Sequence, residues 1–279
     1  MDELSANCNV PAIIDIGCNF AHESFQYDRS ELIARAKAAG IQFCIGTGSS
    51  LESNAWVAQF ALTEPTFLRA TAGIHPHHAD SATPAVLTQV RSQLEHAMVC
   101  AVGETGLDYH RQLASPRAQR TVLEAHLQWA CELKKPIFLH QRDAHKDFLP
   151  IVRAFRDDLP AAVVHCFTDN EKALFDYLDL DLHIGITGWI ADERRGRHLI
   201  PLMPSIPANR LMIETDSPYL LPRTLRPKPK KHRNEPAFLP AVLEALANAR
   251  SVSPHLLAQT TTQTAINFFS LPLDLGIAD

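Results

Sequence analysis

Short runs of apolar residues recur along the chain, and most are nearly continuous in Val, Ile, Leu, Phe, Ala and Cys. Strands of a parallel sheet are buried on both faces, so they are apolar throughout and do not alternate with polar residues. The pattern therefore predicts buried parallel strands. The expected strands are residues 12–16, 43–46, 68–73, 99–103, 137–140, 162–166, 182–186 and 211–215.

The segments between these runs carry helix signals. Ser115-Pro116 and Ser253-Pro254 each place a capping serine before a proline at the first helical position. Strands and helices that alternate eight times predict an α/β protein with a single-domain (β/α)8 TIM barrel. A doubly wound open sheet is the alternative, but no G-x-G-x-x-G follows the first expected strand.

The composition agrees with one large folded domain. The 279 residues are 46% hydrophobic and 20% charged, which excludes intrinsic disorder, and no Gly/Ser-rich linker divides them. We expect a barrel over residues 11–270 between an N-terminal tail, 1–10, and a C-terminal tail, 271–279. We also expect a cytoplasmic monomer with reduced cysteines and no membrane contact. The sequence shows no apolar run of membrane-spanning length, no signal-peptide pattern, no C-x-x-C pair and no coiled-coil repeat.

Polar side chains follow five of the expected strands, in the segments GIHPH (73–77), GETGLD (103–108), LHQRD (139–143), VHCFT (164–168) and IETDSP (213–218). A single His or carboxylate at such a position most often packs or caps a helix. In a (β/α)8 barrel, however, these strand ends converge. Unpartnered imidazoles and carboxylates brought together carry a desolvation cost, which a divalent cation removes. Such a mixed set suits zinc, manganese or magnesium.

These motifs, in this order, resemble those of the TatD family of metal-dependent deoxyribonucleases, which are amidohydrolase-like barrels. Further matches are IGITGW at 184–189, DERR at 192–195 and RNEP at 233–236, and the resemblance runs from residue 13 to about 269. The resemblance implies a metal held by Glu104, His140 and His165, with Asp216 beside it directly or through water. Asp216 is the candidate general base, and His75 is the candidate for steadying the scissile phosphate or the leaving oxygen.

The first strand departs from the family pattern. Many members carry His-x-His at its end, where this chain has Gly17 and Asn19. Glycine offers no ligand, and an amide is a poor substitute for imidazole on a transition metal. We therefore expect one firmly bound divalent ion, magnesium first and manganese or zinc as alternatives. A two-metal site is the alternative arrangement.

Positive charge is concentrated in one segment of an otherwise acidic chain. Residues 223–233 contain six of the 26 basic residues and no acid, so the remaining 20 basic and 31 acidic residues carry a net charge of −11. Prolines keep the segment extended, and it follows the eighth strand. An extended basic arm beside a metal suits a polyanion, although a solvated loop is the default interpretation of a charge run. The candidate substrate-binding residues are His77, Arg142, Arg194, Arg195, Arg223, Lys228, Lys230 and Arg233.

Three residues near the strand ends have two interpretations each. Arg142 is equally suited to a salt bridge with Asp143 or Asp108. Trp189 and Tyr219, just past the seventh and eighth strands, are candidates for stacking on bases or for core packing.

The resemblance implies a 3′→5′ exonuclease that acts on single-stranded DNA, with RNA as a further candidate substrate, in DNA repair or DNA degradation. A D-aminoacyl-tRNA deacylase or another metal-dependent amidohydrolase is the second hypothesis, and the missing His-x-His counts against it. A non-catalytic nucleic-acid binder is the third, and the intact ligand set counts against it.

Overall fold

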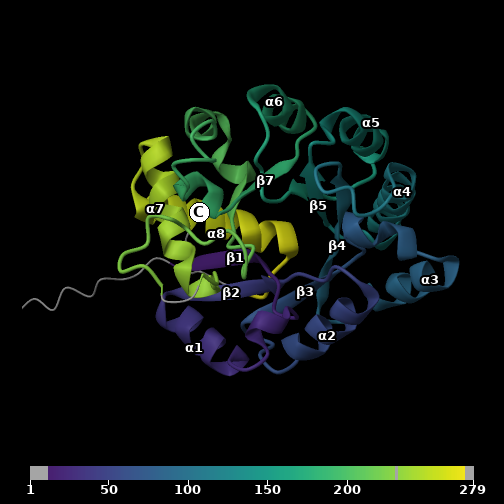
Figure 1. Ribbon diagram of the computed structural model, residues 1–279, viewed down its shortest axis with the longest axis horizontal. Helices are drawn as coiled ribbons and strands as arrows, with labels where there is room; N and C mark the ends of the chain where they lie inside the picture. The colour runs from purple at the N-terminus through teal and green to yellow at the C-terminus, as the bar shows by residue number, and fades with distance from the viewer. Residues whose placement is uncertain (1–11, 230–231, 274–279) are drawn as a thin grey trace, which may run out of the picture.

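The computed structural model describes residues 12–229 and 232–273, and it shows a parallel eight-stranded barrel (Figure 1). Each strand pairs in parallel with the next along the chain. An isolated bridge between Cys18 and Ser217 and a hydrogen bond from the Asp216 N–H to the Gly17 carbonyl join the first strand to the last. The strands are β1 (Ile13–Cys18), β2 (Ile41–Gly46), β3 (Leu68–Ala72), β4 (Val99–Asp108), β5 (Ile137–Arg142), β6 (Ala162–Val164), β7 (His183–Ile186) and β8 (Leu211–Ile213).

Six helices follow the first six strands and surround the barrel (Figure 1). They are α1 (Arg29–Ala38), α2 (Leu51–Ala61), α3 (Pro84–Gln93), α4 (Pro116–Leu133), α5 (His145–Phe155) and α6 (Glu171–Asp179); α7 (Leu239–Arg250) and α8 (Pro254–Phe269) follow β8. Ser115 and Ser253 accept hydrogen bonds from the backbone N–H groups of Ala118 and Leu256. Both predicted helix starts are therefore confirmed.

The predicted barrel is confirmed, but its eightfold strand–helix alternation is incomplete. The connection between β7 and β8 contains only the 3-10 turns η3 (Gly188–Ala191), η4 (Ile200–Ser205) and η5 (Ala208–Arg210). Pro201, Pro204 and Pro207 lie in this stretch, and proline removes the N–H that an α-helix needs. Helix α7 packs against η3 and η4 and so covers the barrel where a seventh helix is missing.

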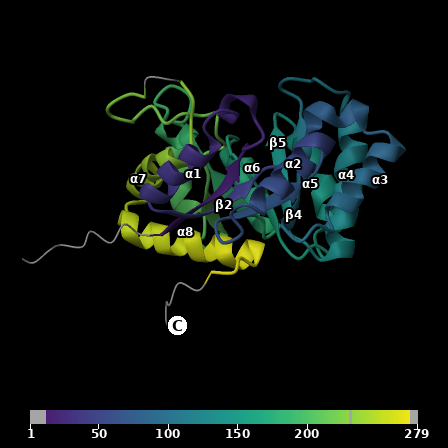
Figure 2. The same cartoon turned by 90° about the horizontal axis from the view of Figure 1, so that it is seen from below.

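Helix α8 closes one end of the barrel. Inward-facing residues of the strands, including Ile14, Phe43 and Phe138, form one buried cluster with Phe268 and Phe269 of α8. In Figure 2, α8 lies across one end of the strands, and the long loop after β8 extends from the opposite end. Apolar burial thus seals the amino ends of the strands, which leaves their carboxyl ends open for chemistry.

Strand β4 is longer than expected and reaches Asp108 instead of ending at Gly103. Glu104 is therefore a strand residue. Gly103 has φ of 127°, and a Cβ there would collide with the backbone carbonyl of Phe138. Only glycine tolerates that conformation at so close an approach, so Gly103 allows β4 to pass β5 and present Glu104 at the mouth.

The expected limits of the barrel at 11 and 270 stay a prediction, because most of both tails lies outside the described residues. Cysteines 18, 44, 100, 131 and 166 have free thiols. No helix within 12–229 and 232–273 is long and apolar enough to cross a membrane.

Asp15 of β1 links the two strands that close the barrel. Its fully buried carboxylate accepts hydrogen bonds from the Gly17 N–H (3.2 Å), the Thr215 N–H (2.9 Å) and the Thr215 hydroxyl (2.6 Å). We expect Asp15→Ala to lower the free energy of unfolding by about 3 kcal/mol, because buried donors lose their acceptor. Urea denaturation measures this, and Asp157→Ala, at an exposed position, is the control. Equal stability of the two variants would contradict the role of Asp15 in barrel closure.

Candidate metal centre

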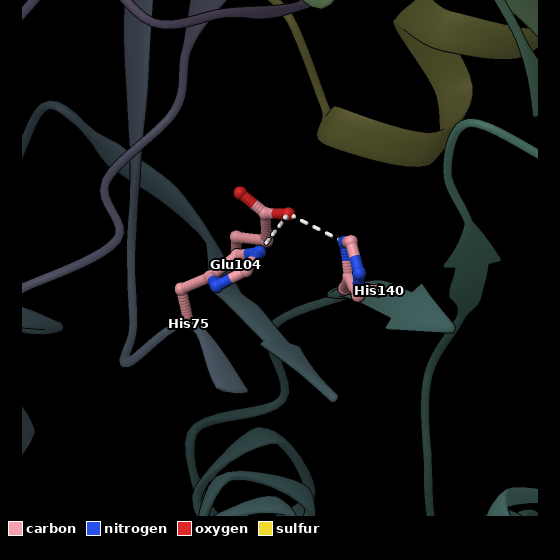
Figure 3. A group of neighbouring side chains, drawn as sticks. All are labelled: His75, Glu104 and His140. Atoms are coloured by element: carbon pink, nitrogen blue, oxygen red, sulfur yellow. Dashed lines mark hydrogen bonds and ion pairs between the residues drawn. The ribbon is translucent and has the colours of Figure 1, made fainter. Parts of the chain in front are cut away.

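The carboxylate of Glu104 is the centre of a group of histidines. Glu104 is 5% exposed, and its Oε1 lies 2.8 Å from Nε2 of His165, 3.0 Å from Nδ1 of His140 and 3.3 Å from Nε2 of His75. His75 follows β3, His140 belongs to β5 and His165 follows β6. The structure thus brings together residues that the sequence placed at separate strand ends, and Figure 3 shows His75 and His140 on either side of Glu104.

This group is able to hold a metal ion. One ligand atom from each of His75, Glu104 and His140 lies within 4.8 Å of the others. Burial opposes ionisation of Glu104, yet the neighbouring imidazoles of His75 and His165 hold its pKa well below the usual range. A buried carboxylate that stays charged among imidazoles suits a cation.

His140 and His165 share an orientation that is typical of metal ligands. Each directs one ring nitrogen toward Glu104 and the other toward a second carboxylate: His140 Nε2 lies 3.5 Å from Asp108 Oδ2, and His165 Nδ1 lies 3.4 Å from Glu214 Oε2. These ring nitrogens and Glu214 Oε2 are buried without a hydrogen bond among the described residues. Outer carboxylates of this kind orient ligating histidines and select their tautomer, so the site fits a metal.

His75 differs from these two histidines. Its Nδ1 accepts a hydrogen bond from the backbone N–H of His77 at 3.1 Å. Without a metal ion, a neutral imidazole that accepts at Nδ1 carries its proton on Nε2, which is then a hydrogen-bond donor. Burial also lowers the pKa of His75 to about 4, which favours the neutral ring. This arrangement agrees with the expected contact of His75 with a phosphate or leaving oxygen.

The turn that carries His75 is held in place by His126, a residue of α4. His126 is fully buried on α4, and its Nε2 accepts the backbone N–H of Ile74 at 3.1 Å. Its Nδ1 lies 2.8 Å from the Val122 carbonyl, to which it donates. The ring therefore satisfies a buried backbone donor beside His75.

Asp216 follows β8 and lines the same cavity, which has a volume of about 620 Å³. Burial raises its pKa to about 7, against the attraction of His165. Asn19 donates from Nδ2 to Asp216 Oδ1 (3.1 Å) and to the Ser217 carbonyl (3.2 Å). The sequence presented Asn19 only as a lost metal ligand; the structure shows that its amide positions the Asp216 carboxylate.

Glu214 explains the glycine at position 17. The Glu214 side chain is fully buried, and its Oε1 accepts the Cys166 N–H at 2.5 Å. A Cβ on Gly17 would collide with Glu214 Oε2. The Glu214 carboxylate, which faces His165, therefore occupies the space that a side chain at position 17 would need. Position 17 provides no metal ligand, and the carboxylate beside it contacts the histidine His165 instead.

Glu214→Gln should weaken metal binding without unfolding the protein. The amide keeps the size of the side chain but presents no negative charge to His165 Nδ1, and loss of such partners typically costs about 10- to 100-fold in metal affinity. Calorimetric titration with Mn²⁺ measures the change. Glu244→Gln, exposed on α7, is the matched control. Unchanged affinity would show that Glu214 only fills space.

Asp108 is a further residue whose place the sequence did not assign. It is 2% exposed; its Oδ1 accepts the N–H groups of His110 (2.9 Å) and Arg111 (2.8 Å), and its Oδ2 lies 2.7 Å from Nε2 of His77. The candidate substrate residue His77 is therefore held by Asp108 at the rim of the cavity. The available signal was the place of Asp108 in the polar segment GETGLD, which follows an expected strand.

The candidate arginines fall into different environments. Arg142 lines the cavity, its guanidinium lies 5.6 Å from the Trp189 ring centre, and it forms no ion pair within the described residues. Its alternative as a partner of Asp143 or Asp108 is not what the structure shows, because those carboxylates contact histidines. Trp189 and the half-exposed Tyr219 both line the cavity.

The basic segment after β8 only partly faces the cavity. Arg223 is bound to Glu193 at 2.7 Å, while Lys228 is exposed. Arg233 lies 2.6 Å from Asp28, and Asp28 also contacts Arg35 of α1. The ion pair of Arg233 with Asp28 holds this end of the segment against α1, and the expected contact of Arg233 with substrate stays a prediction. Lys230 lies outside the described residues.

A barrel with a carboxylate–imidazole centre at the open ends of its strands defines a hydrolase-type TIM barrel with a metal-capable site. The family model for TatD related DNase matches residues 14–270, and the chain belongs to that family.

Relatives with assigned names agree with this membership. The chain is 43% identical to the 3′-5′ ssDNA/RNA exonuclease TatD of Pectobacterium atrosepticum over 93% of this chain and all of that protein. It is 44% identical to the enzyme of the same name from Edwardsiella piscicida, over 93% of this chain and all of that protein. A solved TatD homolog from Escherichia coli K12 superposes with a TM-score of 0.84 at 26% identity, over 93% of this chain and 98% of that one. A TatD family hydrolase from Entamoeba histolytica has a TM-score of 0.85 at 23% identity over the same shares and supports the fold.

Proposed function

We propose that this protein is a metal-dependent 3′→5′ exonuclease that hydrolyses single-stranded DNA and also RNA. The observation that carries the proposal is the buried Glu104 carboxylate with His140 and His165 at the open end of the barrel. The relatives named as 3′-5′ ssDNA/RNA exonucleases match over nearly the full length of both chains, which supports the same activity here.

Glu104, His140 and His165 would hold one divalent ion, with Asp216 beside it. We propose magnesium as the working ion, with manganese and zinc as alternatives, since a carboxylate favours hard cations and imidazole accepts all three. Such an ion, when bound, polarises a phosphoryl oxygen and lowers the pKa of water.

The remaining residues of the cavity have distinct proposed roles. Asp216, with its pKa raised to about 7 by burial, removes a proton from the attacking water. His75 donates from Nε2 to the scissile phosphate or the leaving oxygen, since its Nδ1 is occupied by the His77 N–H. Arg142 binds phosphate with a guanidinium that no carboxylate among the described residues neutralises. Other proposed substrate contacts are His77, Arg194, Arg195, Arg223, Lys228 and Lys230.

We further propose that the protein works as a cytoplasmic monomer in DNA repair or DNA degradation. Free thiols agree with a reducing compartment.

The activity is tested with single strands labelled at either end, incubated with Mg²⁺ or with EDTA. A 3′ label should leave as a mononucleotide at once, whereas a 5′ label should remain on a ladder of shortening products. EDTA should stop both. Release of the 5′ label first would contradict the polarity. If the protein hydrolyses D-aminoacyl-tRNA and leaves single-stranded DNA uncleaved, the deacylase hypothesis is supported instead.

A further inference from the structure

A second, smaller cavity adjoins the proposed catalytic cavity. Its volume is about 240 Å³, and it shares Arg195, Leu220 and His232 with the larger one. Leu220, Leu221 and Pro222 give it an apolar wall, and arginines line its rim. The two cavities therefore adjoin at Arg195, Leu220 and His232.

Positive charge around the second cavity exceeds the nearby negative charge. Arg194 and Arg195 share the single carboxylate of Asp192, while Arg223 pairs with Glu193. Three guanidinium groups thus face two carboxylates. This excess, with an apolar wall beside it, matches a nucleotide, which joins an anionic phosphate to an apolar base face.

Arg195 stands at the junction and is held in place. Its Nε donates to Asp192 Oδ2 at 2.8 Å, and its guanidinium lies 4.6 Å from the Trp189 ring centre. Asp192 is only 3% exposed, and its Oδ1 accepts the backbone N–H groups of Arg194 and Arg195. The terminal nitrogens of Arg195 donate no hydrogen bond within the part of the chain that the structure describes. The Nε contact fixes the guanidinium in place, and its two terminal nitrogens are available to bind a phosphate.

We propose that this cavity is a subsite for the nucleotide on the 5′ side of the scissile bond. Arg195 binds the phosphate next to the scissile one, and Leu220, Leu221 and Pro222 receive the sugar or base of that nucleotide. The inference rests on the proposed exonuclease activity and adds to it a specific recognition of the strand one phosphate upstream of the cut.

The test compares two dinucleotides that differ in one phosphate. Hydrolysis of the unphosphorylated dinucleotide gives a nucleoside and a 5′-mononucleotide, and the 5′-phosphorylated form gives two 5′-mononucleotides. Only the second offers a phosphate to Arg195. We expect the added phosphate to raise kcat/KM at least about tenfold, chiefly by lowering KM, because a hydrogen bond to a charged group is worth about that factor.

Variants of Arg195 test whether this residue causes the preference for the 5′-phosphorylated dinucleotide. Arg195→Ala should reduce the ratio of kcat/KM between the two dinucleotides to about one, and Arg195→Lys should retain part of it. Arg153→Ala removes the same charge from an exposed position in the last turn of α5 and should keep the wild-type ratio. Thermal melting of each variant checks that it is folded.

The outcomes separate the subsite from the activity. A wild-type ratio near one, or a ratio that persists in Arg195→Ala, overturns the subsite while the exonuclease proposal stands. Cleavage of long strands with no cleavage of either dinucleotide also overturns it, because the second phosphate is then insufficient. If no strand of any length is cleaved with Mg²⁺ or Mn²⁺, the proposed function itself fails.

Discussion

Glu104→Gln should abolish nuclease activity, with a loss of at least about 1,000-fold in kcat/KM and loss of tight Mn²⁺ binding. The Glu104 carboxylate is the point where three imidazoles meet, and it is buried in the wall of the cavity. The amide preserves the shape of the side chain but removes the charge that a cation requires. Single-turnover assays on a 3′-labelled strand and Mn²⁺ titration measure the two effects.

The control for this variant is Glu244→Gln, an identical change at an exposed position on α7, which should keep both activity and metal affinity. Thermal melting separates loss of function from loss of fold. If Glu104→Gln cleaves at the wild-type rate, or if wild-type cleavage persists in EDTA, the metal centre is not at Glu104.

Asp216→Asn should lower kcat by about 100- to 10,000-fold, the range typical of a lost general base. Its carboxylate is buried beside the histidines, and burial raises its pKa to about 7, which suits proton removal near neutral pH. The amide retains an oxygen that accepts the hydrogen bond from Asn19, so the local structure should persist. The measurement is kcat at saturating Mg²⁺, with Mn²⁺ affinity determined in parallel.

The two measurements distinguish the two roles predicted for Asp216. A fall in kcat with Mn²⁺ affinity little changed supports the base. A fall in Mn²⁺ affinity with kcat restored by excess metal would make Asp216 a ligand only. Asp157→Asn, at an exposed position, should change neither value.

The barrel was predictable because its strands are buried on both faces. A strand that is buried on both faces requires a continuous run of apolar residues. Such runs can be recognised within a short stretch of the sequence, as at residues 137–140 and 162–166. The connection between β7 and β8 was harder to predict from the sequence. A (β/α)8 barrel normally has an α-helix at this place, and only Pro201, Pro204 and Pro207 indicate that the helix is absent. The end of β4 was missed because Gly103 and Gly106 resemble a turn, whereas both belong to the strand.

The site was predictable only in part. Polar residues directly after apolar runs indicated Glu104, His140, His165 and Asp216, because parallel strands end at one mouth. The position of Glu214 after the eighth strand suits a residue that orients a metal ligand, but no local pattern paired it with His165, or Asn19 with Asp216, since each contact spans far-separated positions. The ion pair of Arg233 with Asp28 was not predictable for the same reason, because Asp28 lies 205 residues earlier in the sequence.

The sequence by itself determined the class of fold, the order of its strands and the residue types gathered at the open end, because each depends on patterns within one segment. Only the tertiary structure decided which nitrogen of each histidine faces Glu104, which carboxylate stands behind it, and which arginines remain available for phosphate. Those properties depend on neighbours from other strands, and closure of the barrel between Gly17 and Asp216 brings those neighbours together. Hydrogen bonding and ion pairing are short-range, so only the folded chain can assign them.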